Sequence, residues 1–447
     1  MAKPYLTAPL PTTHMPPGVP YIVANEAAER FSYYGMRGIL VIFMTHHLLA
    51  RDGSLAVMGK AEAMEHFHNF VSAVYFFPLL GAFLADVWLG KYRTILYLSI
   101  VYCLGHLALS LDETRLGLAL GLGLVAIGSG GIKPCVSANV GDQFGQSNRH
   151  LLEKVFGWFY FSINAGSMFS TILIPELLDN YGPRVAFAVP GVLMFVATLF
   201  FWLGRRKYAH IPPTGWEALR ELFSREGLTV LARMGALYLF VAIFWALYEQ
   251  TGSAWVLQAE QMNLNLGFWT LKPAQTHTLN PILILIFMPL FTYVIYPAID
   301  RIFPLTALRK ISIGLFLTAL AFAVSAMIEN WITAGERPHF AWQALAYAIM
   351  TAAEVMVSIT CLEFSYRQAP PKMKSLLMAE FLLSNSLGNQ LVSQVNRYFQ
   401  DADGKSTLQG ADYYWLFCAI MTVTAVGFIF YAMFFRERTY IQQEQPA

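Results

Sequence analysis

The chain has 447 residues, of which 56% are hydrophobic and only 13% are charged, and its mean hydropathy is positive. This balance is outside the range of soluble globular proteins and indicates a polytopic membrane protein. The formal net charge of +2 excludes the strong basic excess expected of a nucleic-acid-binding protein. The polar N-terminal stretch lacks the features of a cleaved signal peptide. The four cysteines lie in apolar segments, so we expect free thiols and no disulfide.

Twelve stretches are apolar and long enough to cross a bilayer as helices, which takes about 20 residues each. They lie near residues 21–49, 66–88, 92–111, 115–140, 154–178, 184–204, 229–257, 277–299, 308–328, 341–366, 372–398 and 411–435. We therefore predict an all-α membrane protein of two six-helix bundles. Its expected parts are a tail (1–20), a first bundle (21–204), a polar linker (205–228), a second bundle (229–435) and a second tail (436–447).

The distribution of lysine and arginine predicts which side of the membrane each loop faces. In the twelve-span arrangement, nineteen of the thirty basic residues lie on the side of the two termini and eight on the other side. The termini and the linker are therefore expected to be cytoplasmic. The remaining three basic residues, Arg30, Arg37 and Lys133, fall inside spans.

The first span carries four charges. At about 100° per residue, one helical face presents Glu26, Glu29, Arg30, Tyr33 and Arg37. Glu26 and Arg30 are also in the favourable i, i+4 order. A basic residue at the centre of a span costs on the order of 3 kcal/mol, so such groups normally face the protein interior and pair. We interpret this face as the wall of a polar cavity; a surface helix or a structural ion-pair stripe is the alternative.

Two later spans carry further ionisable residues. Lys133 lies in a glycine-rich stretch just before Pro134, and either extends to the cytoplasmic surface or binds an anion. Glu354 lies deep in its span, with Tyr347 two turns earlier on the same face. An unpaired carboxylate at that depth is expected to gain a proton. A structural glutamate paired to another helix is the alternative.

The loop GAFLADVWLGKYRT, residues 81–94, follows the second span. With twelve spans and a central linker, it resembles the loop signature of the major facilitator superfamily, whose halves rock around a midplane site; an ordinary turn with cytoplasmic charges is the alternative. A more specific resemblance, to the proton-coupled oligopeptide transporter family, rests on ERFSYYGMR (29–37), GSGGIKPCVSANVGDQF (128–144), FYFSINAGS (159–167), FWALYEQTGSAW (244–255) and LEFSYRQAPPKMKS (362–375). These motifs are similar to those of the animal intestinal and renal members. The large extracellular domain of those members has no room between the predicted spans here.

The resemblance implies a set of substrate-binding residues. Arg37 and Lys133 would bind the peptide carboxylate, and Glu354 would bind its amino terminus. The other implied positions are Tyr33, Tyr34, Tyr75, Asn164, Trp245, Asn280, Tyr347, Phe381 and Ser384. Without the resemblance, the side-chain amides of Asn164 and Asn280 could equally form hydrogen bonds to neighbouring helices. Aromatic residues in spans are usually packing residues. Phe381 stands where the family usually has tryptophan, and Cys135 where it usually has asparagine.

The resemblance also implies the residues that couple transport to protons, namely Glu26, Glu29, Arg30, His68, Lys133, Glu249 and Glu354. An unperturbed histidine titrates near neutral pH, which suits a proton relay, although a structural histidine is equally compatible with the position of His68. In the animal members Arg233 pairs with an aspartate that is Thr292 here. We therefore expect Arg233 either to find another partner or to extend to water.

These features predict a symporter that imports di- and tripeptides with protons by alternating access. It would lie in the plasma or bacterial inner membrane, with peptides, protons and lipid as its partners and no cofactor or metal. A same-fold transporter of nitrate or another small anion or conjugate, a channel and a non-transporting peptide sensor are the alternatives; the set of Glu26, Glu29 and Glu354 favours peptides. We expect no enzyme, because no nucleophile–base pair or metal cluster is apparent.

Overall fold

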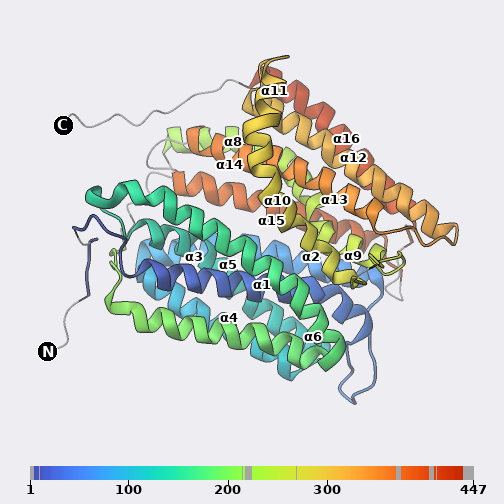
Figure 1. Cartoon of the computed structure of the whole chain (residues 1–447), viewed down its shortest axis with the longest axis horizontal. Helices are drawn as coiled ribbons and strands as arrows, with labels where there is room; N and C mark the ends of the chain where they lie inside the picture. Colours follow the sequence, from blue (N-terminus) through green and yellow to red (C-terminus); the bar gives the residue numbers. More distant parts are fainter. Residues whose placement is uncertain are drawn as a thin grey trace. The chain divides into compact units, whose positions relative to one another are not determined.

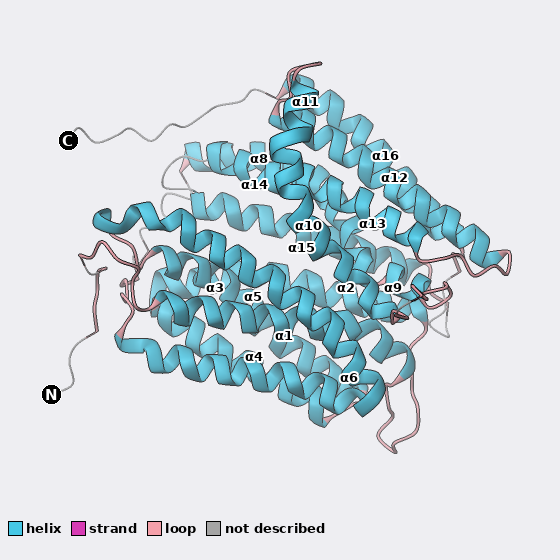
Figure 2. Ribbon diagram, viewed as in Figure 1, coloured by secondary structure: helices cyan, strands magenta, loops and turns pink. Residues whose placement is uncertain are grey.

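A computed structural model describes residues 5–9, 11–213, 215–216, 224–267, 269–368, 374–401, 407–408 and 410–435. Over these residues the chain is helical, with isolated β-bridges as its only extended pairings (Figure 2). It separates into two compact units, which are described individually below. Unit 1 comprises Met1–Met58 and Ala73–Ala218, and unit 2 comprises Gly59–Ser72 and Leu219–Ala447. The bundle limits drawn from the sequence stay a prediction.

The helices that belong wholly or partly to unit 1 are α1 (Val19–His46), α2 (Lys60–Phe76), α3 (Pro78–Phe83), α4 (Lys91–Leu111), α5 (Arg115–Gly141) and α6 (Leu152–Leu203), with a π-helical turn at Leu84–Leu89 (Figure 1). Residues 59–72, which include the first part of α2, group with unit 2. α6 contains two predicted spans. Its helix is interrupted at Gly182, whose φ of +79° is a left-handed value that glycine adopts without strain.

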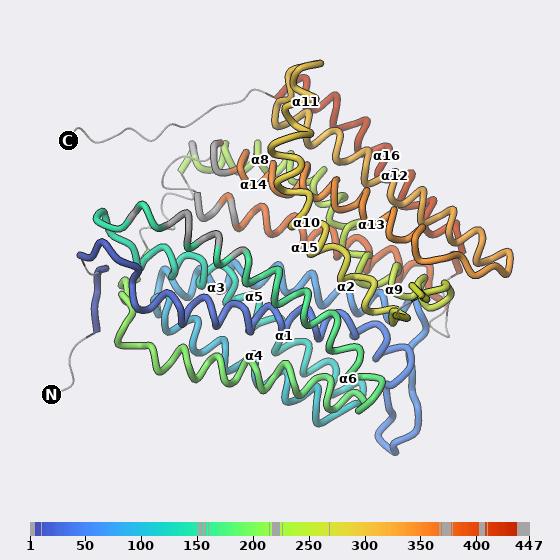
Figure 3. The backbone as a smooth tube through the Cα atoms, in the orientation of Figure 1, coloured from blue at the N-terminus to red at the C-terminus, as the bar shows by residue number. Residues whose placement is uncertain are grey.

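Unit 2 also contains α8 (Arg225–Tyr248), α9 (Ala254–Ala259), α10 (Leu279–Leu290), α11 (Tyr296–Asp300), α12 (Ala307–Thr333), α13 (Ala341–Glu354), α14 (Thr360–Gln368), α15 (Lys374–Tyr398) and α16 (Ala411–Phe434). The backbone trace follows several of these as continuous rods, because α8 leads into α9, α10 into α11 and α13 into α14 through short 3₁₀ or π-helical turns (Figure 3). In both units, each predicted apolar stretch that falls on described residues coincides with a helix or with helices that follow one another directly.

Nine helical stretches of the described chain are long and apolar enough to cross a membrane. One of them, Phe161–Arg206, is 46 residues long and holds the predicted span 184–204 and most of the predicted span 154–178. The stretches of α1 and α15, which carry more polar residues, are not among the nine. The protein is therefore an integral membrane protein.

Several helices begin where a hydroxyl side chain caps the free backbone amides. Thr114 accepts a hydrogen bond from the Gly117 amide at the start of α5, and Ser224 accepts one from the Gly227 amide at the start of α8. Such caps contribute about 1 kcal/mol each. These two caps define the residues at which α5 and α8 begin.

Small residues set the closest helix contacts inside each unit. A Cβ atom on Gly81 of α3 would lie 2.1 Å from the Gly131 carbonyl oxygen of α5. In unit 2, a Cβ on Gly388 of α15 would lie 2.2 Å from the Ala242 carbonyl oxygen of α8. Larger side chains are excluded at both crossings, because backbone atoms occupy the space. Van der Waals packing of this kind holds membrane helices together.

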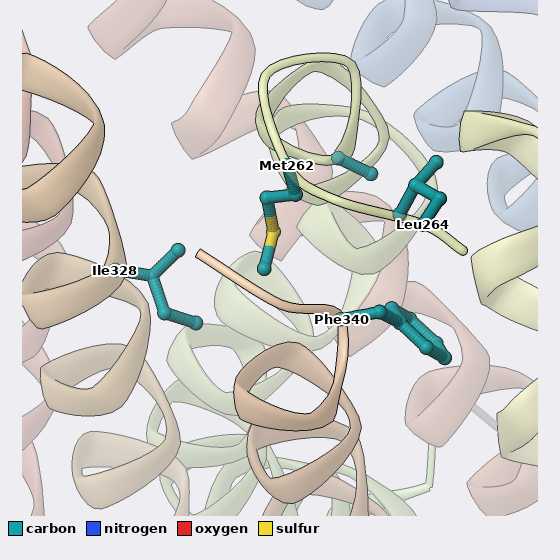
Figure 4. Close-up of a cluster of buried hydrophobic side chains, with 5 residues drawn as sticks. Met262, Leu264, Ile328 and Phe340 are labelled. Carbon is teal, nitrogen blue, oxygen red and sulfur yellow. The ribbon is translucent and has the colours of Figure 1, made fainter. Parts of the chain in front are cut away.

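A small hydrophobic cluster in unit 2 includes residues of the loop that follows α9. Met262 and Leu264 pack with Ile328 of α12 and Phe340 just before α13, and all four are buried (Figure 4). The Phe340 amide also donates to the Asn263 carbonyl, and the Asn263 amide donates to the Pro338 carbonyl. This loop is therefore a packed part of the unit.

The N-terminal tail lies against the segment that follows α6 in unit 1. The His210 amide donates to the Leu6 carbonyl over 2.7 Å, and the Tyr5 and His210 rings stack with their centroids 4.5 Å apart. Further along the tail, the Ser147 hydroxyl donates to the Thr12 carbonyl. The tail and the start of the linker thus form one docked layer.

Candidate functional site

The charged face of α1 is assembled as the sequence predicts. Glu26, Glu29, Tyr33 and Arg37 are each at most 4% exposed. The Nε atom of Arg30 lies 2.7 Å from Oε1 of Glu26 and 3.4 Å from Oε2 of Glu29, so the predicted i, i+4 pair is confirmed. One guanidinium therefore holds two buried carboxylates.

A residue that the sequence analysis missed completes this cluster. The Ser129 hydroxyl of α5 donates to Oε1 of Glu29 over 2.6 Å. Ser129 lies in the GSGG stretch, whose pattern of small residues indicates only close helix packing. A buried carboxylate needs several donors to offset desolvation, and only the α1–α5 packing shows that this serine supplies one.

The Lys133 side chain remains inside unit 1. Its Nζ atom is buried and lies 4.2 Å from the centre of the Tyr33 ring and 5.7 Å from that of Tyr75. Aromatic faces attract cations electrostatically. The alternative in which the ammonium group extends to the surface is therefore not what the structure has. No hydrogen-bond acceptor contacts this ammonium group within the described part of the chain, which suits an anion-binding group.

Two other unit 1 residues of the predicted set, and the cysteine that stands where the family usually has asparagine, are also placed by the structure. Tyr34 packs edge-on against Tyr33, with ring centroids 5.3 Å apart, and Asn164 of α6 is 8% exposed. The thiol of Cys135 donates weakly to the backbone carbonyls of Gly81 and Gly131, each at 3.5 Å. Cys135 thus serves the α3–α5 contact.

The loop signature after α3 carries an ion pair. Nζ of Lys91, the first residue of α4, lies 2.7 Å from Oδ2 of Asp142, which follows α5. The Gly215 amide of the linker also donates to the Asp86 carbonyl. Lys91 is therefore engaged with the residue that follows α5.

In unit 2, Glu354 is held by uncharged groups. The Asn280 amide nitrogen of α10 donates to Oε2 of Glu354 over 2.7 Å, and the Tyr248 hydroxyl donates to Oδ1 of Asn280 over 3.2 Å. No lysine or arginine of the described residues lies within ion-pair distance of this carboxylate. Two residues predicted separately, Asn280 and Glu354, are thus in direct contact.

The predicted aromatic residues of unit 2 divide into two groups. Trp245 and Phe381 lie with ring centroids 6.2 Å apart. Tyr347 is fully buried, donates its hydroxyl to the Thr251 carbonyl and packs edge-on against Trp255. Tyr347 therefore packs inside the helix core, and its contact with the peptide stays a prediction. The Ser384 hydroxyl likewise donates to the carbonyl of Phe381 in its own helix.

A hydrogen-bonded chain connects His68 with Glu249. The Asn385 amide donates to Oε1 of Glu249 over 3.0 Å, and the Asn389 amide donates to Oδ1 of Asn385 over 2.7 Å. Nδ1 of His68 lies 2.7 Å from Oδ1 of Asn389, and its Nε2 lies 2.8 Å from the Ser253 hydroxyl. Because Asn389 offers an oxygen here, Nδ1 is assigned as protonated.

The two asparagines of this chain were missed by the sequence analysis. They lie one turn apart on α15 in LLSNSLGNQ, and i, i+4 amides are a signal that the sequence does contain.

Arg233, whose partner the sequence left open, donates from Nη2 to Oε1 of Gln368 over 3.0 Å. Of the two predicted alternatives, Arg233 therefore finds another partner.

A family model described as the POT family matches residues 92–230 and 224–416. A crystal structure of an auto-inhibited POT family peptide transporter is 34% identical, with a TM-score of 0.86 over 96% of this chain and 99% of that one. The chain belongs to the POT family. Another solved member, a proton-dependent oligopeptide (POT) family transporter, is 37% identical, with a TM-score of 0.78 over 92% of this chain and all of that one.

Curated animal proteins also match this POT family chain. Solute carrier family 15 member 2 from Rattus norvegicus is 39% identical over 78% of the chain, and peptide transporter family 1 from Drosophila melanogaster is 40% identical over 71%. The chain spans about half the length of these relatives, 53% and 48% respectively. The predicted family and the all-α major facilitator fold are confirmed.

Proposed function

We propose that the protein is a symporter that imports di- and tripeptides together with protons by alternating access. The observation that carries this proposal is the division of buried charge: unit 1 offers the cations Arg37 and Lys133, and unit 2 offers the carboxylate of Glu354. A zwitterionic peptide has two opposite charges at its ends whatever its side chains are. Charge-assisted hydrogen bonds to these ends give broad specificity.

In this mechanism Arg37 and Lys133 bind the peptide carboxylate, and Glu354 binds the amino terminus. The uncharged and aromatic residues of the predicted set contact the peptide backbone and side chains. Protons act on Glu26 and Glu29, with His68 and Glu249 as further participants. A proton that moves inward across the membrane contributes about 2.3 kcal/mol per 100 mV. No cofactor or metal takes part, and the protein is not an enzyme.

The proposed location is the plasma or bacterial inner membrane, with the termini and the linker in the cytoplasm. Single cysteines placed in the linker and in residues 257–276 test this topology by labelling with a membrane-impermeant reagent in intact cells. We expect labelling only in 257–276. Labelling of the linker from outside would overturn the topology.

Uptake into liposomes that contain only the purified protein tests the function. An inward proton gradient should concentrate a labelled dipeptide inside, and an uncoupler should abolish the accumulation. Proton-driven uptake of nitrate without dipeptide uptake would favour the anion transporter, and dipeptide binding without accumulation would favour the sensor. Glu354 is hydrogen-bonded to the uncharged Asn280 amide, which favours the peptide, because the peptide amine supplies the cation that a small anion lacks.

A further inference from the structure

Glu380 is an acidic residue of α15 that none of the roles above uses. It lies two turns into the helix, inside the span predicted at residues 372–398. Its Oε2 atom is buried and has no hydrogen-bond donor among the described residues, and no described lysine or arginine pairs with it. Ionisable side chains inside membrane spans are costly and usually functional.

The facing helix, α8, makes room for this carboxylate. A Cβ atom on Gly235 would lie 2.9 Å from Oε1 of Glu380 and meets nothing else closely. Arg233 stands two residues earlier, about 200° around the helix. It is engaged with Gln368 and lies over the Phe435 ring. These contacts of Arg233 are therefore on the side of α8 opposite to Gly235.

The titratable neighbour on the same side is also engaged elsewhere. The Tyr238 hydroxyl of α8 donates to the Ser365 hydroxyl of α14 and to the Leu377 carbonyl. Its ring packs against Phe381, the residue after Glu380, and Phe381 packs in turn against Trp245. Glu380 is therefore the sequence neighbour of one member of the aromatic pair that we assign to the peptide.

We propose that Glu380 is a further proton-binding site of this transporter, located at the α8–α15 contact. The inference rests on the proposed proton coupling. Glu380 is half-buried, and its buried oxygen, Oε2, has no cation or donor among the described residues, which favours the neutral form of the carboxyl group. When α8 and α15 separate and water reaches this oxygen, the proton can leave and the charged form is hydrated. Proton binding at Glu380 would thus favour the state in which the two helices are in contact.

Infrared difference spectroscopy between acid and alkaline pH tests the site without transport. The purified protein in lipid should show a protonated-carboxyl C=O component that Glu380→Gln loses. Glu363→Gln, an exposed glutamate of α14, is the matched control and should leave that component in place. Gly235→Ala should shift its titration midpoint, because the new methyl group displaces Oε1. Superimposable spectra for wild type and Glu380→Gln would overturn the proposal.

Uptake assays distinguish this inference from the function on which it rests. In Glu380→Gln, proton-driven accumulation of dialanine should fall several-fold, while exchange of labelled for unlabelled dialanine continues. A wild type that fails to transport dialanine but shows the infrared component would refute the proposed function and leave the proton site standing. If the variant changes only the affinity for lysine-containing dipeptides, Glu380 recognises substrate side chains and the proton site is wrong.

Discussion

In unit 1, Glu26 and Glu29 lie within 3.4 Å of the Arg30 guanidinium, whereas in unit 2 Glu354 receives its hydrogen bond from the Asn280 amide. The difference matters for protonation. A proton on Glu26 or Glu29 leaves part of a buried cation uncompensated, which is costly. A proton on Glu354 leaves only neutral groups behind. In the function that we propose, unit 1 would couple a proton to a conformational change, and unit 2 would exchange a proton for a ligand amine.

The largest effect is expected when the acid of unit 1 is neutralised permanently. Glu29→Gln should abolish dipeptide accumulation driven by a proton gradient, because the residue can no longer alternate between ion pair and protonated acid. Exchange of labelled for unlabelled peptide requires no net proton movement and should persist in part. If Glu29→Gln still concentrates dipeptide as wild type does, Glu29 is structural and coupling lies at His68 or Glu354.

The free energy of unfolding should distinguish the ion-paired acid of unit 1 from the acid of unit 2 that is hydrogen-bonded to an uncharged group. Glu26→Gln breaks a largely buried ion pair and should lower the free energy of unfolding by about 3 kcal/mol. Glu354→Gln keeps an acceptor for Asn280 and should cost no more than about 1 kcal/mol. Denaturant unfolding of the detergent-solubilised variants measures both. Equal losses would show that the ion pair of α1 adds nothing beyond an ordinary hydrogen bond.

A double-mutant cycle tests the assignment of peptide ends to the two units. Amidating the peptide carboxyl terminus should weaken binding about tenfold or more in wild type and much less in Arg37→Ala, whose partner charge is already missing. Acetylating the amino terminus should give the same pattern with Glu354→Gln. Binding of each peptide is measured by competition against a labelled dipeptide. Additive losses in both cycles would refute the assignment.

The smallest effect concerns the docked N-terminal tail. Burial lowers the pKa of His210 below its usual 6.5, and the charge of Arg93 lowers it further, against the opposing hydrogen bond to the Arg205 carbonyl. The undocked histidine therefore binds a proton at higher pH than the docked one. Docking should weaken as the pH falls below about 6.5.

Hydrogen exchange at the His210 amide, which donates to Leu6, reports this docking. Corrected for intrinsic exchange, protection should decrease at acid pH in wild type. In His210→Gln it should change little with pH, because no titrating group remains. A pH dependence that survives in the variant would assign the effect to another group.

The sequence by itself determined the membrane class, the helices and the face of α1. Apolar length and the 100° repeat are local properties, so the Glu26–Arg30 pair followed from spacing alone. Packing between helices decided the rest: the Ser129 donor to Glu29, the Asn280 contact with Glu354, the asparagines between Glu249 and His68, and the Gln368 partner of Arg233. Apart from Asn385 and Asn389, which are 4 residues apart, these partners are 74 to 321 residues apart, and no periodicity links them. A buried polar group takes whichever donor the tertiary fold brings within reach.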